Sequence, residues 1–286
     1  MSKLALRELS PFQLTLFRVL LAGLTLAVIL GMRGQMREIQ YELRSRLGTM
    51  AVLGLLSFFL SSGSSTTALA FLPASVTSLL TNVSPLFVAL SLILLHRGRV
   101  HLGMISGVLV GLIGLVLVIF GESPTSFGTL VLNPLGVGLA LMSSATWAAY
   151  IVLGQRAMRK SNPQAVVVAS SLFGTIPWLL ITVFSGALPG LSHLPFSEWL
   201  LILYVGIVGT GIPYLLWTAA LTRLSAATVA VFQYTVPFWA IIFAAVLLGE
   251  SITLPLVLGG LGIVAGIAIT QRAPKLPEKV GASSRT

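Results

Sequence analysis

The chain of 286 residues is 56% hydrophobic and only 8% charged, and its mean hydropathy is +1.00. Ordinary globular domains carry about 25% charged residues, so this composition excludes a soluble domain and indicates a polytopic membrane protein. The absence of cysteine excludes disulfides and thiolate metal sites. The net charge of +10 comes from short loops between apolar stretches, a pattern of membrane topology rather than of nucleic-acid binding. We expect no nucleic acid, no metal and no cofactor.

Nine apolar stretches follow one another along the chain, and most are close to the roughly 20 residues that a helix needs to cross a bilayer. Helices are expected because backbone polar groups in lipid must be paired within the segment, and the alternation of barrel strands is missing. The predicted spans are residues 12–32, 49–69, 76–95, 102–120, 135–153, 165–184, 199–219, 226–248 and 254–269. The expected fold class is therefore an all-α polytopic membrane helix bundle.

Lysine and arginine residues are confined to alternate loops, and this asymmetry predicts the orientation. The loops around residues 71–75, 121–134, 185–197 and 249–253 contain neither residue type. The opposite loops and the C-terminal tail contain Arg33, Arg37, Arg44, Arg46, Arg97, Arg99, Arg156, Arg159, Lys160, Arg223, Arg272, Lys275, Lys279 and Arg285. We expect a cell (inner or plasma) membrane protein with a cytoplasmic C-terminus and a disordered tail over residues 271–286.

The second half of the chain repeats the first at one constant offset. The matches include Pro85 with Pro237, Gly107 with Gly259, and Gly114 with Gly266. The copies occupy residues 1–121 and 133–270, with four and five spans, because the equivalent of residues 135–153 would map before Met1. With five helices in each copy, the two copies would have opposite orientations, the inverted repeat of many secondary transporters. We therefore expect either an earlier start of the protein or an impaired carrier. The Gly-x-x-x-Gly pairs beginning at Gly107 and Gly262 suit close helix packing.

Polar and aromatic residues form stripes in three regions, because helix positions three and four apart share a face. The stripes are Ser143, Thr146, Trp147 and Tyr150; then Thr210, Tyr214, Trp217 and Thr218; then Ser78, Thr81, Asn82 and Pro85 with their matches Ala230, Gln233, Tyr234 and Pro237. Such groups either join helices to one another or line a cavity, and we favour the cavity. The predicted substrate-binding residues are Asn82, Pro85, Trp147, Tyr150, Tyr214, Trp217, Gln233, Tyr234 and Pro237.

Pro85 and Pro237 lie near the middle of matched spans. A proline within a helix frees the carbonyl four residues earlier, here that of Thr81 or Gln233. In lipid, such a carbonyl needs a partner or a wet cavity. A simple packing kink is the alternative, but the symmetric placement favours a binding or gating role.

Arg18 is the only charged residue well inside a predicted span, which makes it a functional candidate. It lies about two turns from the outer end of its span and could reach the interface by snorkelling, so we favour structural anchoring over ligand contact. No carboxylate lies within a span, and His96, His101 and His193 lie at loops. Proton coupling is therefore not supported, and the cavity should prefer a neutral, zwitterionic or aromatic-compatible solute.

Three stretches carry a family pattern, and the second and third stand at corresponding places in the two copies. They are Ser10-Pro11 leading to Phe17-Arg18; Ala68-Leu69 and Leu72-Pro73-Ala74-Ser75 leading to Ser84-Pro85; and Ala220-Leu221 and Leu224-Ser225-Ala226 leading to Val236-Pro237, with Gly249-Glu250 at the end. This pattern resembles the EamA-type members of the drug/metabolite transporter superfamily over essentially the whole chain.

The resemblance implies a carrier of ten helices, five in each copy, that exports small metabolites such as amino acids through a central cavity. The family's first helix is missing here. In addition, Arg97-Gly98 stands in the first copy where Gly249-Glu250 ends the matched helix of the second. A structural or gating role at this position would therefore rest on Glu250 alone. Arg18 and Thr81 are further candidates for such a role.

Three classes of function compete. A carrier working by alternating access is the leading hypothesis, and a channel or non-transporting scaffold is the alternative, which a continuously open polar path would reveal. An integral membrane enzyme would need a reactive group of residues at depth, but the predicted spans contain no Asp, Cys, His or Glu. We expect a small-molecule substrate, membrane lipid around the protein and a monomer, with a dimer as the alternative.

Overall fold

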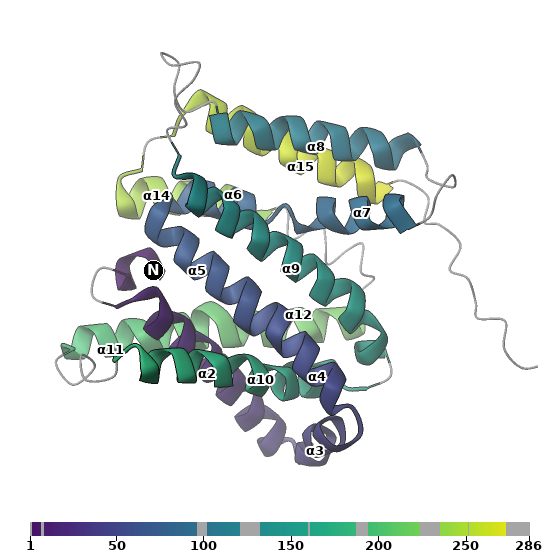
Figure 1. Ribbon diagram of the computed structural model, residues 1–286, viewed down its shortest axis with the longest axis vertical. Coiled ribbons are helices and arrows are strands. Elements are labelled where there is room, and N and C mark those ends of the chain that lie inside the picture. The colour runs from purple at the N-terminus through teal and green to yellow at the C-terminus, as the bar shows by residue number, and fades with distance from the viewer. Residues whose placement is uncertain are drawn as a thin grey trace, which may run out of the picture.

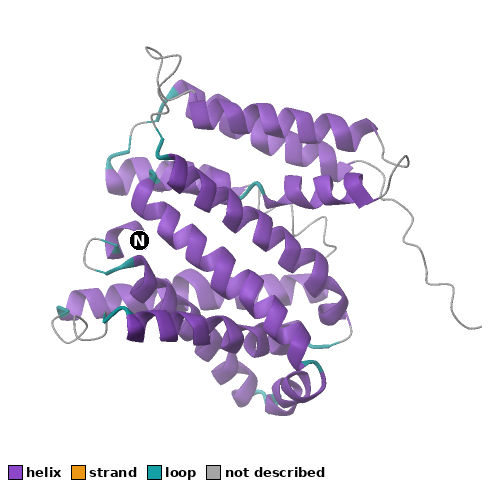
Figure 2. Cartoon of the chain, in the orientation of Figure 1, coloured by secondary structure: helices purple, strands orange, loops and turns teal. Residues whose placement is uncertain are grey.

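The computed structural model describes residues 2–6, 9–95, 102–120, 132–159, 161–186, 194–223, 235–250 and 252–272. All regular secondary structure within these residues is helical (Figures 1 and 2). The elements are α1 (Ser2–Ala5), α2 (Pro11–Met32), α3 (Met36–Ser45), α4 (Leu47–Gly54), η1 (Leu55–Ser61), α5 (Ser62–Phe71), α6 (Ala74–Thr81), α7 (Ser84–Leu95), α8 (Leu102–Phe120), α9 (Pro134–Arg159), α10 (Pro163–Phe184), α11 (Phe196–Leu203), η3 (Tyr204–Gly211), α12 (Ile212–Arg223), α14 (Thr235–Leu248) and α15 (Leu254–Arg272).

Apolar helices occupy all nine predicted spans, which confirms the all-α membrane bundle. Five are long enough by themselves to cross a bilayer: Pro11–Met32, Leu47–Phe71, Pro134–Gly154, Pro163–Phe184 and Phe196–Ala219. The other four predicted spans contain the shorter apolar stretches Ala74–Val88, Ile105–Val118, Trp239–Leu248 and Leu254–Thr270, of which the first is interrupted by a turn at residues 82 and 83. The predicted span 226–248 begins among residues outside the described part, as does the tail beyond residue 272.

Matched helices of the two copies begin with the same local device. Ser10 caps α2 by accepting a hydrogen bond from the Gln13 amide (3.3 Å), and the Gln13 side chain accepts one from the Ser10 amide (2.8 Å). Asn162 caps α10 by accepting from the Gln164 amide at 2.9 Å. In both helices a proline takes the first position, where its missing N–H is not needed.

Helices α8 and α15 pack closely through glycines that the repeat makes equivalent. A methyl group at Gly107 would lie 2.7 Å from the Gly266 carbonyl oxygen, and one at Gly114 would lie 2.6 Å from that of Gly259. In the repeat, Gly259 is the equivalent of Gly107, and Gly266 is the equivalent of Gly114. Replacing each glycine by its equivalent in the other copy therefore converts the first contact into the second. The two helices therefore run antiparallel and are related by a pseudo-two-fold axis. The packing role predicted for the Gly-x-x-x-Gly motifs is confirmed.

A second pair of contacts has the same symmetry. A methyl group at Gly54 would lie 3.1 Å from the Gly174 amide nitrogen, and one at Gly206 would lie 2.6 Å from the Leu21 side chain. Gly206 matches Gly54, and Leu21 is adjacent to the equivalent of Gly174 in the first copy. The relation between the copies thus extends from α8 and α15 across the bundle to α2 and α10.

Two spans contain wider, π-helical turns at matched places, and the sequence did not predict them. They are η1, between α4 and α5, and η3, between α11 and α12. A π-helical turn skips a backbone hydrogen bond, and side chains complete the pairing here. The Trp178 indole donates to the Phe58 carbonyl at 3.1 Å, and the Thr210 hydroxyl donates to the Val205 carbonyl at 2.9 Å.

The prediction of one continuous helix over residues 76–95 was wrong. The structure has α6 and α7, separated by a turn at Asn82 and Val83. The Ser78 carbonyl accepts hydrogen bonds from the Asn82 side chain at 2.8 Å and from the Asn82 backbone amide at 3.2 Å, whereas Pro85 has no amide to donate to the Thr81 carbonyl. Pro85 therefore lies in the first turn of α7, where proline is well tolerated, and not in a helix interior.

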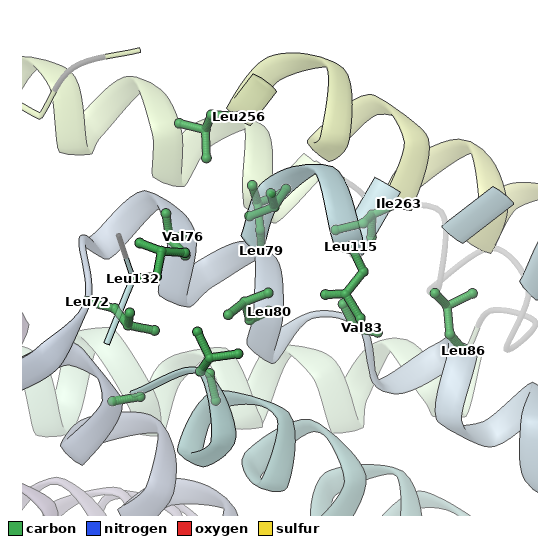
Figure 3. Packing of buried hydrophobic residues seen from close by; sticks show 14 of the residues in the cluster. Leu72, Val76, Leu79, Leu80, Val83, Leu86, Leu115, Leu132, Leu256 and Ile263 are labelled. Carbon is green, nitrogen blue, oxygen red and sulfur yellow. The ribbon is translucent and has the colours of Figure 1, made fainter. Parts of the chain in front are cut away.

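The turn is fixed by the largest apolar core of the described residues. Leu80 from α6, Val83 from the turn and Leu86 from α7 are all buried in it. Leu115 from α8 and Ile263 from α15 complete this part of the core (Figure 3). The break thus lies against the α8–α15 pair and is held by packing on both sides.

Helix α3 is a further element that hydropathy did not predict. Its sequence is mostly polar, but Ile39 and Glu42 are buried, and Arg46 lies 3.6 Å from the Glu42 carboxylate. The loop between the first two predicted spans is therefore an ordered helix on the side that we expect to face the cytoplasm.

The close α8–α15 contact predicts that Gly266→Ala destabilises the protein by about 1–3 kcal/mol, because the added methyl group overpacks the contact. Its Cβ would lie 2.5 Å from the Gly107 carbonyl oxygen. Gly138→Ala in α9 is the control, since nothing lies within 4 Å of its Cβ position. Thermal unfolding in detergent measures both variants. Equal stability of the two would contradict the packing assignment.

Candidate functional site

The aromatic residues of two predicted stripes meet in one cluster around Trp147. The Trp147 ring centroid lies 5.0 Å from that of Tyr150 on α9, and 6.1 and 6.2 Å from those of Tyr214 and Trp217 on α12. Phe58 of η1 lies 5.5 Å from Tyr214 and was not predicted. We call Trp147, Tyr150, Tyr214 and Trp217 the aromatic cluster. It joins α9 to α12, so the two stripes that the sequence places on separate helices form one surface.

Polar atoms accompany the aromatic cluster. The Tyr214 hydroxyl lies 3.4 Å from the Ser57 hydroxyl of η1, which belongs to the first copy. The Tyr150 side chain is fully buried, and its hydroxyl has no hydrogen-bond partner among the described residues. Trp147, Tyr214 and Trp217 keep some exposed surface. The cluster thus offers ring faces and hydroxyl groups, which suit an organic solute with polar groups.

Arg18 points into the bundle, where three elements meet. Its Nε donates to the Thr210 hydroxyl of η3 at 3.1 Å, and its Nη1 donates to the Thr66 hydroxyl of α5 at 3.4 Å. Thr210 precedes Tyr214 by about one helical turn in the same span. The two hydrogen bonds give a geometric basis for anchoring without snorkelling, and they place the charge beside the aromatic cluster.

At the break between α6 and α7, the carbonyl freed by Pro85 finds a partner in the other copy. The Ser144 hydroxyl of α9 donates to the Thr81 carbonyl at 3.1 Å. The Thr81 hydroxyl bonds back to the Thr77 carbonyl of its own helix at 2.8 Å. Ser61 of η1 donates to the Ser143 carbonyl at 3.0 Å, which is a second hydrogen bond between the two copies. Thr81, which precedes Asn82 at the break, is therefore joined to α9 through Ser144, the neighbour of Ser143 in the first stripe.

Some predicted residues are not placed. Gln233 and Tyr234 lie outside the described residues. Pro237 lies in the first turn of α14, two residues after its start at Thr235, so only its backbone position is defined. This position corresponds to that of Pro85 in α7, as the repeat requires.

Glu250 links the two copies at the start of α6. Gly249 ends α14 with a φ of 68°, a left-handed conformation that favours glycine, and Glu250 follows directly. Its carboxylate accepts hydrogen bonds from the Ala74 amide (2.6 Å), the Ser75 amide (3.0 Å) and the Ser75 hydroxyl (2.7 Å). Lys3 lies 3.7 Å away and donates to the Leu72 carbonyl at 2.5 Å. We call Glu250, Ser75 and Lys3 the outer clasp. Ser75 and Lys3 lie in helices and Glu250 lies in a loop, all at the ends of segments that we expect to face outward.

The clasp also explains the ionisation of Glu250. Partial burial by itself raises the pKa of this carboxyl group, but the hydrogen bonds from Ser75 and Ala74 and the charge of Lys3 outweigh it, and the pKa lies below its ordinary value. The carboxylate also faces the positive N-terminal end of α6. The sequence indicated Glu250 by its position alone and gave no sign of these partners, which are distant along the chain.

No group of three or more His, Cys, Asp or Glu residues comes together within the part of the chain that the structure describes. What the site offers is aromatic surface, hydroxyl groups and one guanidinium. Such groups bind and orient a solute.

The inverted repeat, the broken helix and the polar groups at membrane depth define a multi-pass membrane protein of the transporter class. The chain matches the EamA-like transporter family over residues 1–120 and 134–272. It therefore belongs to the EamA-like transporter family, and its general role is transport.

Relatives and a solved structure agree with this assignment. An uncharacterized transporter of Archaeoglobus fulgidus is 30% identical over 94% of this chain and 90% of the relative. The threonine/homoserine exporter RhtA of Escherichia coli is 36% identical over 45% of this chain and 42% of the exporter. A protein crystal structure shares the fold with a TM-score of 0.64 at 23% identity, covering 93% of this chain and 90% of its own.

The outer clasp predicts a pH dependence of stability. Because the folded-state pKa of Glu250 lies below its ordinary value, its contribution is present above the unfolded pKa and is lost as the pH falls through the folded one. The unfolding temperature of the wild type should therefore drop more between pH 7 and pH 3 than that of Glu250→Gln. Glu198→Gln, which also removes a carboxylate from a predicted outer region, serves as the control and should keep the wild-type drop. Identical pH profiles for wild type and Glu250→Gln would contradict the assignment.

Proposed function

We propose that the protein is a secondary carrier that exports small polar metabolites such as amino acids by alternating access. It would act in the cell membrane with its C-terminus in the cytoplasm. The single observation that carries the proposal is the meeting of both copies at the site: Tyr214 of the second copy contacts Ser57 of the first, and Ser144 of the second holds the Thr81 carbonyl of the first. A solute between these groups would touch both halves.

The broken helix supports a solute site at this depth. Discontinuous helices in transporters place backbone groups in the middle of the membrane, where they interact with substrate. Here the interruption at Asn82 and Val83 lies close to α9, whose Ser144 bonds to the Thr81 carbonyl. The site for the solute is therefore proposed between this break and the aromatic cluster, with Asn82, Trp147, Tyr150, Tyr214 and Trp217 as binding residues. Gln233, Tyr234 and Pro237 stay candidates by repeat symmetry.

The pseudo-two-fold arrangement supports alternating access. If two halves have the same fold in opposite orientations, exchanging their conformations converts an inward-facing state into an outward-facing one. The outer clasp joins α6 of the first copy to Glu250, which follows the end of α14, in the second, so it would have to open when the outer side opens. The aromatic cluster is formed within one chain, and we propose the monomer as the functional unit.

Amino acids are the proposed substrate class because the partial relative RhtA is named a threonine/homoserine exporter and because the site combines hydroxyl groups with aromatic faces. A channel would also present polar groups to the membrane interior. Saturable exchange of solute across proteoliposomes distinguishes the carrier from a channel.

The site assignment predicts that Trp147→Ala lowers flux at least about tenfold, because it removes the ring that contacts the three others of the cluster and so disrupts binding and orientation. Uptake of radiolabelled L-threonine and L-homoserine into proteoliposomes measures this effect. Trp239→Ala is the control, since Trp239 is half exposed on α14 and packs on Phe243 outside the cluster. Unchanged uptake by Trp147→Ala would contradict the assignment.

The absence of carboxylates inside the predicted spans predicts that flux responds little to an imposed pH gradient, because the usual proton relay of Asp or Glu is missing. Uptake with and without a gradient of two pH units should differ by less than about twofold. A dissipated gradient, produced with an ionophore, is the control. Concentrative uptake driven by the pH gradient alone would show that protons are coupled in another way.

A further inference from the structure

Arg18 carries a charge at membrane depth without a counter-charge among the described residues. The ion pairs of the described part are Lys3 with Glu250 and Arg46 with Glu42, both at helix ends or loops. The chain contains no aspartate at all. A buried charge without an opposite charge is unfavourable, so the site around Arg18 is electrostatically suited to an anion.

The hydrogen bonds of Arg18 leave part of its guanidinium unused. A guanidinium has five N–H donors, whereas the bonds to Thr210 and Thr66 engage one at Nε and one at Nη1. Both threonine hydroxyls already donate their own proton to a backbone carbonyl, Thr210 to Val205 and Thr66 to Ser62, each at 2.9 Å. Their lone pairs are thus directed at Arg18. The two threonines hold the guanidinium in place without neutralising it.

Repeat symmetry does not require this charge. The position equivalent to Arg18 in the second copy is Ser170, which is fully buried and donates to the Val166 carbonyl of its own helix at 2.7 Å. By contrast, Thr66 matches Thr218, which is also a threonine. The guanidinium is therefore a feature of one copy only, and packing at the matched position is satisfied by a small neutral residue.

The surroundings of Arg18 continue into the aromatic cluster. Thr210, which accepts from Arg18, lies about one helical turn before Tyr214, and the Tyr214 ring is 6.1 Å, centroid to centroid, from Trp147. Arg18 keeps some exposed surface. A solute with an anionic group at Arg18 would thus have its body beside Tyr214 and Trp147.

The geometry points to Arg18, held by Thr66 and Thr210, as the subsite for the carboxylate group of the transported solute, an inference that rests on the proposed transport function. A guanidinium presents parallel N–H donors that match a carboxylate. The single positive charge matches a carboxylate with its one negative charge better than a phosphate, which carries nearly two at neutral pH. The substrate class is therefore small monocarboxylates, including zwitterionic amino acids.

Binding is tested on the purified full chain in lipid nanodiscs. The probes are three acid–amide pairs, L-threonine with L-threoninamide, acetate with acetamide and benzoate with benzamide, and the readout is the rise in unfolding temperature with concentration. At least one acid should stabilise the wild type saturably while its amide does not. The inference of a carboxylate subsite is overturned if no acid raises the unfolding temperature of the wild type or if each acid and its amide raise it equally. It is also overturned if inorganic phosphate raises the unfolding temperature more than every acid.

Variants tie the effect to Arg18. Arg18→Gln should weaken the apparent affinity for the acid at least about tenfold, because a charge-assisted hydrogen bond is lost. Arg18→Lys keeps the charge but loses the fork of donors, and it should weaken the affinity by about threefold or more while the protein stays folded. Arg33→Gln removes an exposed arginine from the end of the same helix and is the control, with wild-type affinity expected. If Arg18→Gln does not fold, Arg18→Lys decides, and wild-type affinity in that variant overturns the inference.

Flux measurements separate this inference from the proposed function. If proteoliposomes carry no solute while the acids bind in an Arg18-dependent manner, the carrier proposal fails and the subsite stands. If proteoliposomes carry neutral solutes and Arg18→Lys leaves both this flux and binding unchanged, the subsite fails and the carrier stands.

Discussion

In the hydrocarbon of a membrane, each backbone carbonyl that leaves a helical hydrogen bond needs another donor, and this requirement governs the irregular parts of the bundle. The Thr81 carbonyl is paired with the Ser144 hydroxyl, the Phe58 carbonyl with the Trp178 indole, and the Val205 carbonyl with the Thr210 hydroxyl. Each donor belongs to a polar side chain that hydropathy alone would count against a membrane span. One of these donors, Thr210, also accepts a hydrogen bond from Arg18, so at this residue the pairing of the backbone and the formation of the candidate site depend on the same side chain.

Most of the fold could be predicted from the sequence because the signals are local or repeated. Apolar length gave the spans, and the common register of Gly107, Gly114 and Pro85 with their matches gave the two copies. The break at Asn82 escaped prediction, since residues 76–95 contain enough apolar residues for one span, and the sequence does not show the bond from the Asn82 side chain to Ser78 or the burial of Val83. The π-helical turns escaped for a similar reason, because their missing bonds are completed by distant residues such as Trp178.

The sequence predicted which residue types belong to the candidate site, but it did not predict how they are arranged in space. Helical spacing placed Trp147 with Tyr150 and Tyr214 with Trp217, but it could not show that the two pairs meet. The interpretation of Arg18 as an anchor by snorkelling followed from its distance to the helix end. Its direction depends on Thr66 and Thr210, which lie on other helices, and no spacing along one helix contains that information.

The glycine contacts of α8 and α15 bear on how the two halves of the protein can diverge. At these positions an added side chain would meet main-chain atoms of the opposite helix, such as the Gly266 and Gly259 carbonyl oxygens. A substitution in the partner cannot relieve such a clash, because the backbone is the same whichever residue is there. After a duplication, these glycines therefore cannot be replaced by larger residues in either copy. Equivalent positions such as Arg18 and Ser170, or Tyr214 and Ser62, can differ, and there one copy has a functional side chain that the other lacks.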